Sequence, residues 1–207
     1  MNYYFDCEFI EGFHKPLFGK RRHHIDLISI GIVCEDGRRY YAISKEYNFN
    51  DASDWVKENV IIQIYREQLT VFKQQFMDIK TFHKYIPDGK TNEQIVGELY
   101  QFISCPKGHT VDFYGYYSDY DWVLFCSLFG TMMDLPKGFP MYCKDLKQML
   151  DDKAESLTNE GFVGIPSFEN KINFLKAAVN YPKQNNEHNA LADAEWNMQL
   201  HKFLKTF

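Results

Sequence analysis

The segment from Ile25 to Cys34 (IDLISIGIVC) restricts the fold of this chain more than any other part of the sequence. Apolar and β-branched residues follow one another almost without interruption, which is typical of a strand buried on both faces. Glu35-Asp36-Gly37 is a strong tight-turn signal, and Arg39 to Ser44 then predicts a returning strand. An aromatic-rich segment from Tyr3 to Phe9 predicts the strand before them. The chain is therefore expected to begin with three antiparallel strands.

The rest of the chain is predicted to be mostly helical. A helix is expected from Asn50 to Gln75 with Asp51 as its cap, and another from Thr91 to Ile103, where Thr91 and Gln94 approximate a capping box. Later segments predict a fourth strand from Thr110 to Tyr116, a helix capped by Ser118, and helices at Leu146 to Leu150, Asn170 to Val179 and Ala190 to Leu204. The expected fold class is α/β, with a mixed sheet flanked by helices. With 207 residues, one domain over residues 1–207 is expected.

The charge and the cysteines exclude several classes of protein. The formal net charge of −5 argues against a protein that coats long nucleic acid, although it allows an enzyme that holds only a few nucleotides. No two cysteines have the spacing of a zinc or redox site, so reduced thiols in a cytoplasmic protein are expected. The first residues lack the regions of a signal peptide, and no apolar run is long enough to cross a bilayer.

The acidic pair in Asp6-Cys7-Glu8 lies on the first predicted strand. Residues two apart on a strand point to the same face, so Asp6 and Glu8 would project together and Cys7 would point away. Two carboxylates side by side on an apolar strand repel each other and resist burial unless a cation lies between them. The plain alternative is a solvent-exposed strand end with two hydrated acids, because such a pair alone often occurs by chance.

Two further acidic clusters lie next to helix starts. Ser118 and Asp119 stand where a helix N-terminus needs oxygen acceptors, so capping accounts for Asp119. Asp121 lies inside the first turn, from which it could reach a metal at the edge of the sheet. His188 and Asp193 lie at the start of the last predicted helix, and the small residues around Asp193 would let another element approach closely. A local hydrogen bond of the histidine and a solvated helix acid are the alternatives for this pair.

Taken together, these clusters resemble the DEDDh 3′→5′ exonuclease superfamily, which has a ribonuclease H-like fold. Asp6-Cys7-Glu8 matches its Asp-x-Glu motif, Tyr120-Asp121 matches an aromatic residue followed by Asp, and His188 to Asp193 matches His, four residues, then Asp. Asn189 stands where the related DEDDy branch has Tyr. The segments DCEFIEG, IDLISIGIVCEDGRRYYAIS and EHNALADAEW are similar to a small bacterial and phage exoribonuclease group with a mycobacterial member.

The resemblance implies a reaction with two divalent cations, Mg²⁺ or Mn²⁺. Hard cations prefer oxygen ligands, and the implied ligands are Asp6, which would bridge the two ions, together with Glu8, Asp121 and Asp193. His188 would be the general base that takes the proton from the attacking water. The substrate would be single-stranded RNA or an RNA 3′ overhang, and the products nucleoside 5′-monophosphates. Relatives are often dimers, so a homodimer is also considered.

Three other residues are candidates for substrate binding. Arg21 and Arg22 belong to a basic run in the predicted loop from Gly12 to His24, where they could hold phosphates of the incoming strand. A solvated loop is the alternative for this run. Phe9 could stack on or wedge beneath the terminal base, although an apolar residue on a buried strand commonly belongs to the core.

Rival functions remain open from the sequence. A 3′→5′ DNA exonuclease would use the same residues, because contacts to the 2′-OH that distinguish RNA often come from the backbone. A catalytically silent nucleotide- or RNA-binding module could keep the fold, although all five motif residues are present. A structural protein would leave the paired carboxylates on an apolar strand without explanation.

Overall fold

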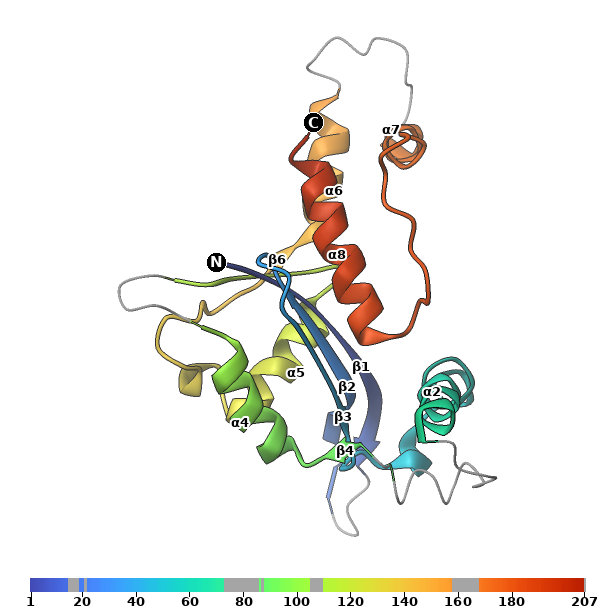
Figure 1. Cartoon of the computed structure of the whole chain (residues 1–207), viewed down its shortest axis with the longest axis vertical. Helices are drawn as coiled ribbons and strands as arrows, with labels where there is room; N and C mark the ends of the chain where they lie inside the picture. The colour runs from blue at the N-terminus through green and yellow to red at the C-terminus, as the bar shows by residue number, and fades with distance from the viewer. Residues whose placement is uncertain are drawn as a thin grey trace.

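A six-stranded mixed sheet forms the middle of the molecule, and helices cover both of its faces (Figure 1). The computed structural model describes residues 1–14, 19–20, 22–72, 86, 88–104, 110–157 and 168–206. The strands are β1 (Asn2–His14), β2 (Arg22–Cys34), β3 (Arg39–Ser44), β4 (Gly89–Lys90), β5 (Asp112–Gly115) and β6 (Lys144–Asp145). They lie in the order β4-β3-β2-β1-β5-β6, and the first three pair antiparallel as predicted. The predicted α/β class is confirmed, and the arrangement is consistent with a ribonuclease H-like fold.

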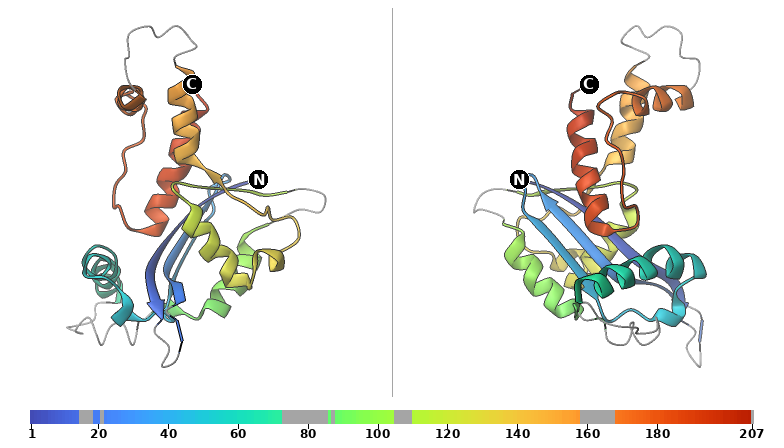
Figure 2. Two further views of the ribbon diagram at one scale, coloured as in Figure 1. Left: turned by 180° about the vertical axis from the view of Figure 1, so that it is seen from behind. Right: turned by 45° about the vertical axis from the view of Figure 1, so that its right-hand side comes forward.

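The helices divide between the two faces of the sheet (Figure 2). The helical segments are η1 (Phe49–Asp51), α1 (Asp54–Val56), the π-helical η2 (Lys57–Ile61), α2 (Ile62–Phe72), α4 (Asn92–Phe102), α5 (Asp119–Phe129), η3 (Met132–Asp134), α6 (Leu146–Ser156), α7 (Phe168–Lys176) and α8 (Ala190–Leu204). Helices α4 and α5 pack on one face, whereas α8 crosses the other (Figure 1). Within the described residues, no helix has both the length and the apolar character of a membrane span.

The predicted helix from Asn50 to Gln75 differs most from the structure. Asp51 caps no helix, because it ends η1 and accepts a hydrogen bond from the Asn48 side chain (2.8 Å). The longer helical stretch begins instead after Ser53, whose hydroxyl accepts from the backbone of Val56 (3.2 Å). Gln75 lies outside the described residues. By contrast, the capping box of Thr91 and Gln94 is present at the start of α4.

Two strands that the sequence pattern did not predict complete the sheet at its edges. β4 pairs parallel with β3, and β6 pairs parallel with β5. Each contains only two residues, which is too short for an alternation of apolar and polar residues to be seen. The closing helix from Ala190 to Leu204 is confirmed, and the helix expected around Asn170 to Val179 is found at Phe168–Lys176.

The first two strands extend further than the sequence pattern predicts. They stay paired until His14 meets Arg22, so the predicted loop from Gly12 to His24 is wrong at both of its ends, which belong to β1 and β2. Residues 15–18 and 21 of that loop lie outside the described residues. Cross-strand contacts support the extra pairs, since the Phe13 and His23 rings lie 5.7 Å apart. Gly12 also leaves room for the imidazole opposite it, because an added Cβ would lie 2.9 Å from the His24 ring. The result is a two-stranded extension beyond the body of the sheet.

The packing of α8 against β2 depends on the absence of a side chain at Gly31. A Cβ added there would lie 2.3 Å from the carbonyl carbon and oxygen of Ala190, the first residue of α8. Gly31 is also the antiparallel partner of Asp6 in β1. The close backbone approach therefore sets the start of α8, and with it Asp193, beside Asp6.

Substitution of this glycine is expected to displace α8. Gly31→Ala should lower the free energy of unfolding by about 3 kcal/mol, because the methyl group meets backbone atoms that cannot rotate away. Gly97→Ala is the matched control: Gly97 lies within α4, and a Cβ there would meet nothing within 4 Å. It should raise stability by up to ~1 kcal/mol. Urea unfolding of both variants measures the difference, and equal stabilities would contradict this account.

Candidate functional site

The open edge of β1 is the position where the acidic residues gather. β5 pairs with β1 only from Asn2 to Tyr4, so the following residues of β1 have no strand partner on that side within the described chain. Asp6 and Glu8 lie in this unpaired part, just before an irregularity in the register with β2 between Glu8 and Phe9. An open edge leaves space for a ligand that a continued sheet would fill.

Three carboxylates from two elements converge there. Asp6, Glu8 and Asp193 each offer an oxygen atom, and these atoms all lie within 4.8 Å of one another. Asp193 comes from the first turn of α8, whose position Gly31 sets. Cys7 points to the other face and is buried in the core, as the alternation of the strand predicted.

Asp121 is joined to the same place by a hydrogen bond to β1. Its Oδ1 accepts from the backbone nitrogen of Cys7 at 3.0 Å, and the side chain is only 7% exposed. The bond holds the first turn of α5 against the strand between the two acids Asp6 and Glu8. The predicted proximity of this aspartate to the other acids is therefore found.

Ser118, immediately before α5, behaves differently from the prediction. It stands at the N-cap position, but its side chain accepts no capping hydrogen bond. Its hydroxyl lies 3.1 Å from the Cys143 sulfur, and its backbone nitrogen donates to Asp145 (2.9 Å). The capping prediction for Ser118 is wrong because these neighbours from β6 and the preceding loop take its polar groups. Asp119 is exposed in the first turn of α5.

His188 lies in a strained turn that leads into α8. Its φ of 67° is in the left-handed region, which a residue with a Cβ rarely adopts. Its backbone nitrogen donates to Asp193 Oδ2 (2.9 Å), and its ring contacts the Trp55 ring edge-on at a centroid distance of 4.9 Å. Asn189 then caps α8 through its side-chain oxygen. These contacts hold the imidazole beside the acids.

The acids and His188 line one hollow of about 290 Å³, here called the carboxylate hollow. Its lining residues are Asp6, Cys7, Glu8, Phe9, Tyr116, Tyr117, Asp121, Gln184, His188, Asp193, Trp196 and Asn197. The sequence motifs thus name five of these residues as candidates for chemistry, and Phe9 as a candidate for substrate binding.

Sequence reasoning missed two amides that support the acids. Gln184 donates to Asp193 Oδ1 (2.7 Å), and the buried Asn197 donates to the carbonyl of Phe5 (3.0 Å). Asn197 thereby ties the middle of α8 to β1 next to Asp6. Asn197 follows Asp193 by one helical turn, so its place on the inner face of the last helix was the available signal.

Burial and mutual repulsion make the site unfavourable for negative charge. Burial raises the pKa of Asp6 well above its usual range, and the charges of Asp121, Glu8 and Asp193 raise it further. Burial, followed by the charges of Asp193 and Asp121, raises the pKa of Glu8 to about 8. The pKa of Asp121 rises to about 7, again through burial, although the hydrogen bond from Cys7 opposes the rise.

The donor set fits hard divalent cations. Four carboxylates face one hollow, and in the described part of the chain no lysine or arginine forms an ion pair with any of them. Such crowding of acids is costly unless positive charge is supplied from outside. Oxygen ligands without a nearby thiolate ligand suit Mg²⁺ or Mn²⁺. Cys7, the cysteine in the lining, packs in the core with its thiol.

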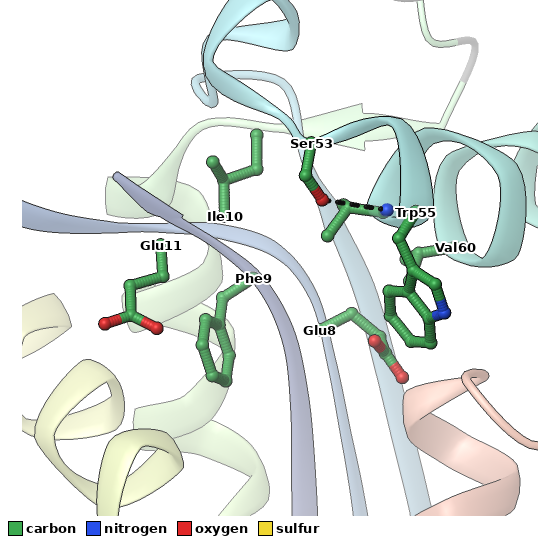
Figure 3. A pocket seen from close by; sticks show the side chains of 8 residues that line it. Glu8, Phe9, Ile10, Glu11, Ser53, Trp55 and Val60 are labelled. Atoms are coloured by element: carbon green, nitrogen blue, oxygen red, sulfur yellow. Dashed lines mark hydrogen bonds between the residues drawn. The ribbon is translucent and has the colours of Figure 1, made fainter. Parts of the chain in front are cut away.

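A second hollow adjoins the first and is here called the Trp55 hollow (Figure 3). Glu8 and Phe9 line both hollows, and Trp55, Val56 and Val60 add apolar surface to the second. In Figure 3 the Glu8 carboxylate lies beside the Trp55 ring, whereas Phe9 points to the other side of β1. Trp55 is 55% exposed, so its indole face is available to a ligand.

The three residues predicted to bind substrate lie in different parts of the structure. Phe9 lies at the site, since it lines both hollows and is only partly exposed. Arg22 is exposed at the far end of the β1–β2 extension and does not line the carboxylate hollow. Arg21 lies outside the described residues.

Comparison with known proteins finds one matching family and two relatives with the same named activity. The model of a family described as the 3′-5′ exoribonuclease Rv2179c-like domain matches residues 17–204. Two proteins of Mycobacterium tuberculosis are each 29% identical to the chain over 154 residues, which cover 74% of this chain and 76% of the relative. They are the 3′-5′ exoribonuclease Rv2179c of strain ATCC 25618 / H37Rv and the 3′-5′ exoribonuclease MT2234.1 of strain CDC 1551 / Oshkosh. The range matched by the family model contains Asp121, His188 and Asp193 and begins after Asp6 and Glu8.

The raised pKa values predict how the metal-free protein responds to pH. Between about pH 4 and pH 8 the folded protein holds protons on these carboxyl groups that the unfolded chain has released. The contribution of these groups to stability should therefore be fully present below about pH 4 and should be lost as pH rises through the folded pKa values of about 7 and 8. Thermal unfolding with a chelator present, measured from pH 4 to pH 8, tests whether the Tm falls as pH rises.

One substitution separates charge repulsion from other effects of pH. Glu8→Gln should raise the Tm of the metal-free protein at pH 8 and should reduce the further rise produced by Mn²⁺. Glu155→Gln, which removes an exposed acid from α6, is the matched control and should change neither value. A Glu8→Gln protein that is less stable than the parent at pH 8 would show that the carboxylates do not repel one another as described.

Proposed function

The chain belongs to the family of the 3′-5′ exoribonuclease Rv2179c-like domain, and on this premise we propose that it removes nucleotides from the 3′ end of single-stranded RNA with divalent cations. It is an enzyme of the 3′→5′ exoribonuclease class, as the family and both mycobacterial relatives are named. The cation requirement, the preferred strand, the role of each side chain and membership of the DEDDh superfamily make up the proposal.

A single observation carries the proposal: four carboxylates and one histidine from three elements line one hollow at the open edge of β1. β1 supplies Asp6 and Glu8, α5 supplies Asp121, and the start of α8 supplies Asp193 with His188 just before it. A phosphodiester is negatively charged, so these acids would repel the substrate without cations. With cations bound, the same acids support phosphodiester hydrolysis.

Asp6, Glu8, Asp121 and Asp193 are proposed to be the residues that would hold two Mg²⁺ or Mn²⁺ ions. When bound, such ions activate water and stabilise the charge that develops on the leaving 3′ oxygen. Asp121 is held in place for this task by the backbone of Cys7, and Asp193 by Gln184 and by the backbone of His188.

His188 is proposed to accept the proton of the attacking water at an imidazole nitrogen. Its ring lines the carboxylate hollow, and the edge-on contact with Trp55 limits its rotation. Its backbone bond to Asp193 connects the base directly to a proposed cation ligand. Histidine suits this task because it exchanges protons near neutral pH.

The terminal nucleotide is proposed to lie between the two hollows. Its phosphate would face the acids, and its base would lie against the exposed ring of Trp55 in the Trp55 hollow. Apolar and aromatic contacts accept any base, as an exonuclease requires. The products are then nucleoside 5′-monophosphates.

The rival functions differ in a measurable way. A DNA exonuclease would share the acids and His188, and only the rate on matched RNA and DNA of one sequence distinguishes it. A silent binding module would bind nucleotides without releasing products under any cation. We therefore propose 5′-labelled single-stranded RNA and DNA as paired substrates, each with Mn²⁺, with Mg²⁺ and with excess chelator. Cation-dependent shortening of RNA from the 3′ end, faster than that of DNA, is the expected result.

Two substitutions should separate proton transfer from cation binding. His188→Ala should keep Mn²⁺ binding, measured by calorimetry, and should lower kcat by at least about a hundredfold, the usual contribution of a general base. Asp6→Ala should lose both cation binding and turnover. Asp152→Ala, which removes an exposed acid from α6, should match the parent enzyme in both measurements. Full turnover in either site variant would contradict the assigned roles.

A further inference from the structure

A row of aromatic rings leads away from the carboxylate hollow along the β1–β2 extension. Phe9 stacks on Tyr120 of α5 at 6.1 Å between ring centroids, and Tyr120 contacts His23 of β2 at 6.3 Å. His23 in turn contacts Phe13 near the end of β1 at 5.7 Å. These four residues, here called the aromatic row, connect the site to the tip of the extension.

Most of the aromatic row is exposed. Phe13 is 53% exposed, Tyr120 is 46% exposed and the side chain of His23 is 40% exposed. Phe9 is the partly buried member and packs against the core on the side of α5. Large apolar rings that adjoin one another on a surface commonly mark a binding site. Core packing accounts for the position of Phe9 but not for that of the outer three.

We propose that the aromatic row binds the bases of the RNA strand that lie upstream of the nucleotide being removed. The inference rests on the proposed exonuclease function. The row is continuous with that site, because Phe9 lines both hollows. Within the described residues the row reaches Phe13, which is the cross-strand partner of His23 near the end of β1. An RNA strand that leaves the carboxylate hollow along this face would therefore meet aromatic rings along its bases.

Stacking suits this chain better than bulk electrostatic attraction. With a net charge of −5 the protein gains little from release of counterions along a strand. Every base has a flat face, so rings bind all sequences alike. The rings of the row touch each other, and the bases would therefore lie over their exposed faces. Glu11 pairs with His23 Nε2 at 2.8 Å and fixes the plane of that imidazole.

If the aromatic row binds upstream bases, the rise of kcat/KM with RNA length should depend on Phe13. For the parent enzyme, kcat/KM should rise from a dinucleotide to an RNA of about eight nucleotides, which is long enough to cover the row. Phe13→Ala should leave dinucleotide hydrolysis unchanged and lower kcat/KM on the longer RNA by about tenfold, the scale of one lost base stack. Phe13→Trp should restore the parent value. The same loss is expected with DNA, because stacking does not read the sugar.

Tyr100→Ala is the matched control, since Tyr100 is a 54% exposed ring on α4 outside the aromatic row. Tyr100→Ala should leave kcat/KM unchanged for both the dinucleotide and the longer RNA. The proposal would be overturned if Phe13→Ala lowered kcat/KM equally for the dinucleotide and the longer RNA, or lowered it for neither. A changed mass of Phe13→Ala in sedimentation with the length dependence intact would also overturn it, because the row would then join two copies of the chain.

Failure of the proposed function is distinguished by measuring binding without turnover. Fluorescence anisotropy of labelled RNA with Glu8→Gln measures RNA binding, and the added Phe13→Ala substitution gives the share of the aromatic row. Suppose that the parent enzyme hydrolyses no substrate, but that Glu8→Gln/Phe13→Ala binds RNA about tenfold more weakly than Glu8→Gln. The proposed function is then wrong, and the proposal for the aromatic row is retained. If the parent enzyme hydrolyses RNA but Phe13→Ala does not weaken the binding of long RNA, the proposal for the aromatic row is wrong and the proposed function is retained.

Discussion

The close contact between the start of α8 and the middle of β2 is the constraint on which the site depends. Gly31 permits it, and a side chain there would collide with the backbone of Ala190. Through this contact one helix delivers both the turn of His188 and the carboxylate of Asp193 to β1. Asn197, one turn later, binds β1 again and fixes the direction of the helix. The site is thus a junction between elements that are far apart in the sequence.

Electrostatic repulsion is built into this junction. Burial and neighbouring charges raise the pKa values of Asp6, Glu8, Asp121 and Asp193 together, and in the described residues no basic side chain forms an ion pair with them. The rest of the fold must hold the acids in place, which the aromatic core under α5 and the hydrogen bond from Cys7 help to do. Positions of this kind are typical of function rather than stability, because a fold selected for stability alone would separate such charges.

Much of the fold and the site could be predicted because their signals are local. The antiparallel start followed from the apolar run and the turn at Glu35-Asp36-Gly37, and the helix at Thr91 followed from its capping box. The length of the β1–β2 extension, the two-residue strands and the polar partners of Ser118 could not be predicted, since each depends on residues distant in sequence. Gln184 is an example within the site: nothing near it in sequence indicates that it binds Asp193.

The β1–β2 extension has a consequence for how such enzymes diversify. Its pairs beyond Phe9 carry none of the acids that gather at the open edge, so residues can be inserted or deleted there in register without moving the chemistry. Paired strands tolerate such changes when both lengthen by the same amount. Homologues with extensions of different length would therefore be expected to share one hydrolytic centre and to differ in the RNA length up to which kcat/KM keeps rising.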